Sequence, residues 1–160
     1  MSIFKVITKK DQDLNDLYSR CIYITDCRST KLDLIYGSNI NIHFPFNSMI
    51  LVKKIFNQEN GHTYHHFVLS VDTSDTVDPY TFYVLSVQVC ELIAYFGGNY
   101  QVLMAVHINT DNLHTHFICN NIDFLTGKRM NVNYSMLHGI KENINLILEN
   151  YDLSTIHMNY

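Results

Sequence analysis

The sequence lacks the features that mark membrane, secreted and nucleic-acid-coating proteins. No apolar run reaches the about 18–20 residues that a membrane-spanning helix needs, and the opening MSIFKVITKK has no signal-like apolar core. The four cysteines form no CxxC pair, so reduced thiols in a cytoplasm are expected instead of a disulfide framework or a zinc knuckle. The net charge of −4 excludes a strongly basic coat, so any contact with nucleic acid must be local, metal-assisted or shared with partners.

What the sequence does contain is enough apolar material for one folded domain. Hydrophobic residues make up 47% of 160 residues, and no repeat or Ser/Gly linker divides the chain, so residues 1–160 are expected to form a single domain. Runs rich in apolar and β-branched residues predict strands over 2–8, 63–72, 100–108, 113–122 and 129–133.

Apolar residues at helical spacing predict four helices. Their expected N-caps are Asp11, Asn47, Asp78 (followed by Pro79) and Ser135. The apolar side of the second helix is expected to contain Ile50, Leu51, Ile55 and Phe56. The segment 30–46 shows no clear periodicity apart from a turn at 37–38. Helices packed against a mainly antiparallel sheet predict an α+β fold.

Three of the nine histidines stand within ten residues, in the segment AVHINTDNLHTHFICNNID at 105–123. If residues 109–112 form a hairpin loop, His107 faces His114 directly, with Cβ atoms about 4.5–5.5 Å apart. His116 projects from the same face, about 6.6 Å further along the strand. Three such imidazoles can converge on one metal ion and leave coordination positions open for substrate. A register shift of one residue would separate His107 from the other two.

The longer segment AVHINTDNLHTHFICNNIDFLTGKRM resembles the histidine motif of plasmid and conjugative-element mobilisation relaxases, the MobP-like branch of the HUH endonucleases. That motif has a histidine, a seven-residue step, His-x-His-hydrophobic, an asparagine and a Thr-Gly-Lys turn. The matching residues here are His107, His114, His116, Phe117, Asn120 and 126–128. CIYITDCRST at 21–30 is similar to the family's tyrosine motif, and YHHFVLSVD at 64–72 to the strand before its first long core helix. The resemblance covers nearly the whole chain.

The resemblance implies an HUH nuclease fold and a DNA endonuclease and strand transferase that nicks one strand of an origin of transfer. A tyrosine attacks the scissile phosphate, which leaves a 5′-phosphotyrosyl intermediate and a free 3′-hydroxyl, and the reverse reaction closes the strand. The implied partners are single-stranded or supercoiled DNA at that origin, accessory mobilisation proteins and a coupling protein. The implied setting is the bacterial cytoplasm, without membrane insertion.

Tyr23 matches the tyrosine of the motif and is the predicted nucleophile. Tyr18 is the runner-up, although its helical spacing with Leu14 and Cys21 predicts a core-facing side chain. A phenol with a pKa of about 10 needs activation, and a metal can neutralise charge on the phosphate. Imidazole ligands favour Mn²⁺, Zn²⁺, Co²⁺ or Ni²⁺, and the family implies Mg²⁺ or Mn²⁺, so Mn²⁺ is expected first.

The residues that support the chemistry are less well defined by the sequence. The family often has an aspartate where this chain has Asn109. A carboxylate that orients an imidazole or accepts the phenol proton could come from Asp26, Asp111 or Glu91, with a weak preference for Asp26. The predicted contacts with DNA phosphates are Arg28, Lys31, Lys128 and Arg129.

Two histidines and two other functions complete the predictions. His65 and His66 are adjacent in a strand and must face opposite sides of the sheet, so one of them could point toward the site, although a structural role is preferred. One alternative function is an HUH replication-initiation nuclease, which has the same chemistry at a different origin. The other is a relaxase remnant that binds metal or DNA without catalysis.

Overall fold

The computed structural model describes residues 1–9 and 12–158. One five-stranded, fully antiparallel sheet has the order β1-β3-β5-β4-β2. The strands are β1 (Ile3–Ile7), β2 (Ile35–Ser38), β3 (Tyr64–Ser70), β4 (Val102–His107) and β5 (His114–Asn120). The helices are α1 (Leu14–Ile24), α2 (Pro45–Ile55), α3 (Pro79–Tyr95) and α4 (Tyr134–Asn150), with the short 3₁₀-helix η1 (Leu32–Leu34). The predicted α+β architecture is confirmed.

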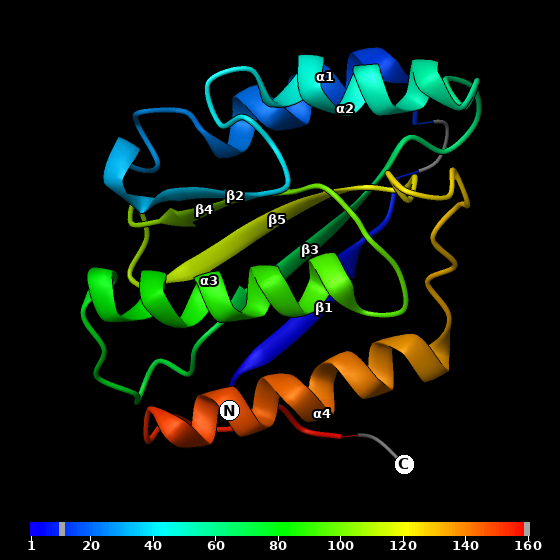
Figure 1. Ribbon diagram of the computed structural model, residues 1–160. Coiled ribbons are helices and arrows are strands. Elements are labelled where there is room, and N and C mark those ends of the chain that lie inside the picture. The colour runs from blue at the N-terminus through cyan, green and yellow to red at the C-terminus, as the bar shows by residue number, and fades with distance from the viewer. Residues whose placement is uncertain (10–11, 159–160) are drawn as a thin grey trace.

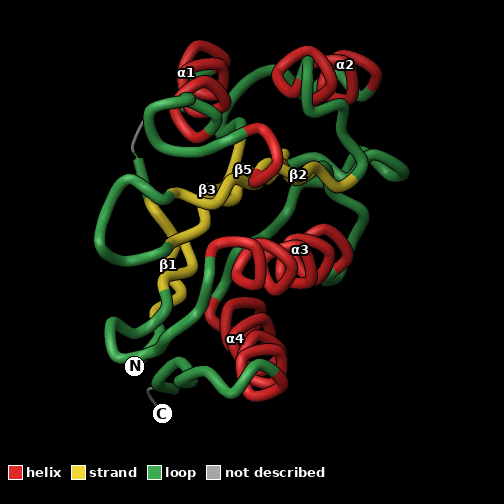
Figure 2. The backbone as a smooth tube through the Cα atoms, turned by 90° about the vertical axis from the view of Figure 1, so that its left-hand side faces the viewer, coloured by secondary structure: helices red, strands yellow, loops and turns green. Residues whose placement is uncertain are grey.

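The helices cover both faces of the sheet. Helices α1 and α2 lie on one face, and α3 and α4 lie on the other (Figures 1 and 2). Along β4, Leu103 and Ala105 belong to the core beneath α1 and α2, whereas Met104 belongs to the core beneath α3 and α4. Because side chains alternate along a strand, His107 projects from the α1/α2 face.

The helix caps explain where the helices begin. Asp78 accepts from the amides of Tyr80 and Thr81 with Pro79 at the first helical position, as predicted. The predicted cap Asp11 lies outside the described residues, and Asp13 forms a capping box on α1. The cap of α4 is Asn133, not Ser135, because the Asn133 side chain accepts from the amide of Met136.

The second predicted helix is present as α2, but its predicted cap and buried side are wrong. Pro45 stands at the first helical position after Phe44, so Asn47 lies inside the helix and does not cap it. The predicted apolar side is exposed at Leu51 (60%) and Ile55 (64%). The helix buries instead the residues Met49, Val52 and Lys53.

A buried lysine sets the orientation of α2. Lys53 Nζ donates to the carbonyl of Thr63 at 2.6 Å and to Oδ1 of Asn121 at 2.7 Å, and its side chain is fully buried. Burial, together with the positive charge of Arg129, lowers the pKa of Lys53 to about 7. These hydrogen bonds come from distant parts of the chain and offset the cost of burying the ammonium group. Periodicity of α2 alone could not reveal them.

Two local predictions also fail, the turn at 37–38 and the strand at 129–133. Gly37 and Ser38 do not form a turn, because they pair with Leu103 and Val102 as part of the edge strand β2. Residues 129–133 make only one isolated bridge, Arg129 with Ile122, and no strand. Edge pairing depends on the neighbouring strand and has little signature in the local sequence.

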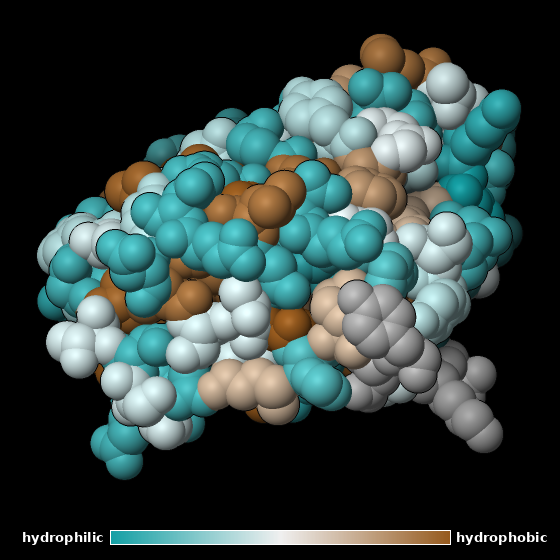
Figure 3. Space-filling model, turned by 90° about the horizontal axis from the view of Figure 1, so that it is seen from below, coloured by the Kyte–Doolittle hydropathy of each residue, from teal (hydrophilic) through white to brown (hydrophobic). Residues whose placement is uncertain are grey.

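Other features of the structure concern membrane spanning, the cysteines, the chain ends and the surface. No helix among the residues that the structure describes is both long and apolar enough to cross a bilayer. Cys21, Cys27, Cys90 and Cys119 are all free thiols, as expected. The two ends of the described chain meet at a parallel bridge between Ser2 and Ile156. Polar side chains cover much of the face seen from below, with apolar side chains between them (Figure 3).

Candidate active site

The hairpin of β4 and β5 gathers the three histidines as the spacing predicted. His107 pairs directly with His114, and His116 lies two residues further along β5 on the same face. Their ring centroids are 4.4 Å (His107–His116), 5.1 Å (His114–His116) and 5.2 Å (His107–His114) apart. Each ring offers a nitrogen, and the three nitrogens lie within 4.8 Å of one another. One divalent ion could therefore contact all three.

Tyr23 lies beside this cluster, in the last turn of α1. Its ring centroid is 5.8 Å from that of His107 and 5.6 Å from that of His116, and its side chain is 47% exposed. The side chain is thus close to the histidines and open to solvent. A large ligand such as DNA could reach it.

A hydrogen bond fixes the helix end that carries Tyr23. His107 Nε2 donates to the carbonyl of Ile24 at 2.9 Å. The last carbonyls of a helix have no partner within the helix, so this histidine satisfies one of them. The hydroxyl of Thr25 satisfies the carbonyl of Cys21 at 2.8 Å. His107 therefore couples the tyrosine-bearing turn to the strand that carries the histidine cluster.

The hydrogen bonds also define which nitrogens are free. A carbonyl oxygen only accepts, so the bond to Ile24 requires a proton on His107 Nε2 and leaves its Nδ1 lone pair free. His114 Nδ1 lies 2.9 Å from the carbonyl of Asn112, which leaves its Nε2 free by the same reasoning. His116 Nε2 is buried and has no hydrogen-bond partner in the part of the chain that the structure describes.

The charge state of the cluster suits a metal. Burial lowers the pKa of His116 to about 2, and the neighbouring His107 and His66 act in the same direction. Burial likewise lowers the pKa of His107. Neutral imidazoles keep their lone pairs available at ordinary pH. The residues present, above all the orphaned His116 Nε2, therefore fit a divalent metal ion.

Two further residues belong to the site, and the sequence analysis did not assign them there. His66 is 3% exposed, and its Nε2 lies 2.8 Å from His116 Nδ1. The guanidinium of Arg20 lies 5.8 Å from the ring centroid of Tyr23, within cation–π range. The signal for Arg20 was its position three residues before Tyr23, which shares a helix face with it. For His66, strand alternation showed only that either His65 or His66 faces the cluster, and the pairing of β3 with β5 places His66 on the face of His116.

Tyr18 is not part of the cluster. It is 52% exposed and packs edge-on against Phe46 with ring centroids 5.2 Å apart, so the prediction of a core-facing side chain is wrong. Its apolar neighbours in sequence misled the prediction, because Leu17 and Cys21 occupy the buried stripe of α1 instead.

The four candidates for an orienting or basic residue lie in different places. Asp26 is close to the cluster, but Arg28 holds it through Nε and Nη2, and this pairing keeps the pKa of Asp26 well below its usual range. Asn109 and Asp111 are exposed in the hairpin loop. Glu91 accepts from the hydroxyl of Tyr36 at 2.7 Å on the α3 side of the sheet, so the structure does not bring it to the histidines.

The predicted phosphate contacts fall into two groups. Arg28 and Lys31 are exposed on the loop after Tyr23. That loop lies beside the hairpin, because the amide of Ile108 donates to the carbonyl of Ser29. Lys128 and Arg129 lie beyond the other end of β5, whose last residue, Asn120, is six residues or about 20 Å from His114.

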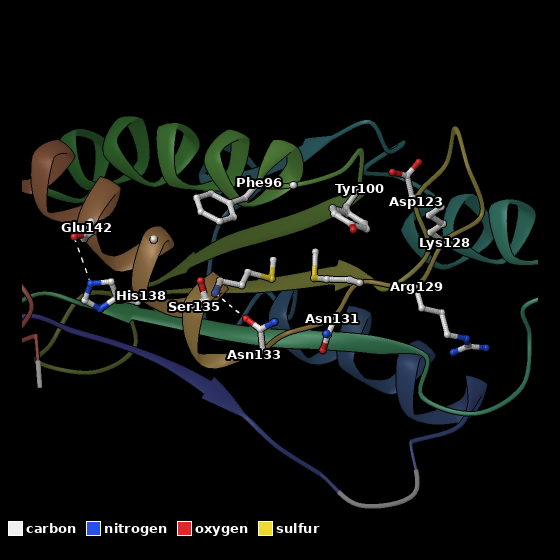
Figure 4. Close-up of a pocket in the computed structure, with 14 residues that line it drawn as sticks. Phe96, Tyr100, Asp123, Lys128, Arg129, Asn131, Asn133, Ser135, His138 and Glu142 are labelled. Carbon is white, nitrogen blue, oxygen red and sulfur yellow. Dashed lines mark hydrogen bonds and ion pairs between the residues drawn. The ribbon is translucent and has the colours of Figure 1, made fainter. Parts of the chain in front are cut away.

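Lys128 and Arg129 border a separate pocket of about 670 Å³, which Figure 4 shows. Its other walls come from the end of α3 and the start of α4, through Phe96, Tyr100 and Met136. Arg129 donates to the carbonyls of His62 and Asn60 and to the side chain of Gln58, so its guanidinium anchors the loop before β3.

Comparison with known proteins agrees with this fold. A solved structure described as "Molecular Basis of Vancomycin Resistance Transfer in Staphylococcus aureus" superposes with a TM-score of 0.67, covers all of both chains and is 14% identical. At that identity the likeness shows the fold. The model of the family "Relaxase: MobA/VirD2-like, nuclease domain" matches residues 23–153. The chain therefore belongs to the MobA/VirD2-like relaxase nuclease domain family.

Particular relatives are similar in sequence over part of their length. Protein rlx of Staphylococcus aureus is 29% identical over 136 residues, which cover 85% of this chain and 39% of that protein. The group II intron-interrupted relaxase LtrB of Lactococcus lactis subsp. cremoris is 28% identical over 65 residues, 41% of this chain and 11% of that protein. The chain thus spans about two fifths or less of the curated relatives that it matches.

Proposed function

We propose that this chain is a catalytic relaxase domain that nicks one DNA strand at an origin of transfer and rejoins it. Tyr23 is the nucleophile, and His107, His114 and His116 hold a divalent ion, with Mn²⁺ or Mg²⁺ expected. The observation that carries the proposal is that Tyr23 lies with its ring centroid within 6 Å of those of His107 and His116, at a solvent-open position.

The chain's own residues would position the nucleophile. The hydrogen bond from His107 to Ile24 fixes the last turn of α1. The Tyr23 ring is therefore already held beside the histidines, so the entropy cost of orienting the nucleophile is not added to the reaction barrier. The Tyr23 oxygen would form a bond to the scissile phosphorus while the bond to the 3′-oxygen breaks. The product is a phosphotyrosyl ester, which retains the energy for rejoining the strand.

Positive charge near the tyrosine would bind the substrate. Arg20 lies against the Tyr23 ring, and Arg28 and Lys31 are exposed on the next loop. Contacts with phosphates position a strand without reading its sequence. Lys128 and Arg129 are too far from the tyrosine to share this role at the scissile phosphate.

The bound metal would supply a Lewis acid for the phosphate oxygens. It would be held by His107 Nδ1, His114 Nε2 and His116 Nε2, the nitrogens that the hydrogen bonds leave free or without a partner. Asp26 is a poor acceptor for the phenol proton, because its pairing with Arg28 lowers its basicity. Its negative charge beside His107 instead favours cation binding.

The test is incubation with a supercoiled plasmid that carries the element's own origin of transfer, with Mn²⁺. We expect a nicked circle, with protein attached to the 5′ end of the cut strand on a denaturing gel. Tyr23→Phe should abolish the adduct, and Tyr18→Phe, an exposed tyrosine on the same helix, is the matched control. EDTA should stop the reaction.

Three results would contradict the proposal. An adduct that survives in Tyr23→Phe would assign another nucleophile. Cleavage at an origin of replication, and not at an origin of transfer, would favour a replication-initiation nuclease. DNA binding without any adduct would indicate a domain that has lost catalysis.

A further inference from the structure

The hydrogen bond made by His116 can run in either direction, whereas the hydrogen bonds made by His107 and His114 each have one possible donor. His107 and His114 are each held by a backbone carbonyl, which fixes their protonated nitrogen. His116 is held by another imidazole, because its Nδ1 lies 2.8 Å from Nε2 of His66. A neutral imidazole has one donor nitrogen and one acceptor nitrogen, so this hydrogen bond can run in either direction.

The two directions have opposite consequences. If His66 donates, the proton of His116 must sit on Nε2, and that nitrogen has no lone pair for a metal. If His116 Nδ1 donates, His116 Nε2 keeps a free lone pair that can bind a metal ion. His116 Nε2 and His66 Nδ1 are both buried with no hydrogen-bond partner among the described residues, so each direction leaves one buried N–H unpaired. Only the second direction leaves a lone pair on His116 Nε2 for an ion held by the three-histidine group.

The geometry points to His66 as the positioning residue that sets the tautomer of His116: we propose that His66 Nε2 accepts a hydrogen bond from His116 Nδ1 and so keeps His116 Nε2 free for a metal ion. This inference rests on the proposed metal site and deepens it.

The position of His66 fits this role. It is almost fully buried and lies diagonally across the β3/β5 pair from His116, on the same face of the sheet. Its ring centroid is 5.0 Å from that of His116, and its Nε2 lies 2.8 Å from His116 Nδ1. His66 forms a hydrogen bond with one predicted metal ligand, His116, and is not itself one of the three histidines that make up the predicted site.

An imidazole in this place differs chemically from the usual carboxylate. Metal-bound histidines commonly donate their second N–H to a carboxylate, a carbonyl or a water. A carboxylate would add a negative charge to the cluster. His66 provides the acceptor without that charge, so the full charge of the ion would remain available to the phosphate. The proton of His66 then sits on its Nδ1.

The first test reads the tautomer directly in the metal-free protein. Long-range ¹H–¹⁵N correlation spectra of ¹⁵N-histidine protein distinguish a protonated ring nitrogen from an unprotonated one. We expect His116 to carry its proton on Nδ1 and His66 on Nδ1. A proton on His116 Nε2 would overturn the proposal, whatever the activity of the protein.

The second test measures Mn²⁺ affinity by calorimetry. His66→Leu removes the acceptor, and we expect affinity to fall about 10–100-fold, the range typical for such partners. His66→Gln can present a carbonyl oxygen at a similar reach and should restore most of the loss. His65→Phe, the neighbour on the opposite face, is the matched control and should bind Mn²⁺ as the wild type does.

Each outcome decides the inference separately from the proposed function. Equal Mn²⁺ affinity of wild type and His66→Leu refutes it, as does a loss that His66→Gln does not restore, because the role of His66 would then be packing alone. If the spectra and affinities follow the expectation but wild type forms no adduct with DNA, the catalytic proposal fails and the role of His66 stands.

Discussion

Buried neutral histidines should make this domain unusually sensitive to mild acid. Burial lowers the pKa of His65 and of His66 to about 4, and that of His116 to about 2. Unfolding exposes all three to water, where a histidine has a pKa of about 6.5. Below pH 6.5 the unfolded chain therefore binds more protons than the folded one, so stability falls as the pH falls.

The expected loss can be worked out for metal-free protein. Each histidine contributes about 1.4 kcal/mol per pH unit once the pH is well below 6.5. Between pH 6.5 and pH 5, which is still above all three folded pKa values, each contributes about 1.6 kcal/mol, or about 5 kcal/mol for the three. That is a large part of the about 5–15 kcal/mol that stabilises a typical domain. The lowered carboxyl pKa values act only at lower pH and do not interfere.

Urea unfolding in EDTA at pH 7.5, 6.5 and 5, followed by circular dichroism, measures this loss. His65→Phe removes one titrating group and should reduce the loss by about a third. His43→Gln, at an exposed position, should leave it unchanged. A loss below about 1.5 kcal/mol in the wild type, about one histidine's share, or no effect of His65→Phe, would refute the reasoning.

Four further outcomes are expected. Mn²⁺ at 100 times its dissociation constant should stabilise the domain by about 2.7 kcal/mol, or about 5–11 °C in melting temperature, and His114→Ala should remove the shift in a thermal melt. Glu91→Gln should leave nicking and Mn²⁺ affinity within twofold of wild type, because Glu91 lies on the other face. Gly127→Ala should lower stability by at least about 1–2 kcal/mol, since Gly127 has φ +72° and a Cβ would come within 2.4 Å of Phe56. Arg129→Met should lower it by about 1–3 kcal/mol without changing Mn²⁺ affinity, as denaturant titration and calorimetry can show.

The parts of the site that a local pattern encodes could be predicted, and the parts that depend on distant contacts could not. The face shared by His107, His114 and His116 follows from strand alternation and a short hairpin loop, both of which are local. The place of His66 required the pairing of β3 with β5, which lie about 50 residues apart in sequence. Lys128 and Arg129 were predicted to contact DNA phosphates because they follow the hairpin in sequence, but β5 carries the chain to the far end of the sheet before them.

The same division explains the errors in the fold. Caps such as Asp78 act within one helical turn and are legible in the sequence. The burial of Lys53 depends on oxygen atoms of Thr63 and Asn121, so an apolar stripe alone gave the wrong face of α2.

By itself, the sequence determined the α+β class, the histidine hairpin and the resemblance to relaxases, because period-2 alternation, capping residues and motif spacing are properties of neighbouring residues. Only the tertiary structure decided which tyrosine lies beside the histidines. Tyr23 comes close to His107 because its neighbour Ile24 accepts a hydrogen bond from His107, a residue 83 positions away in sequence. It also decided that His66 forms a hydrogen bond with His116 and that Glu91 lies on the opposite face of the sheet from the histidines. Sheet order and helix placement are set by the packing of the whole chain.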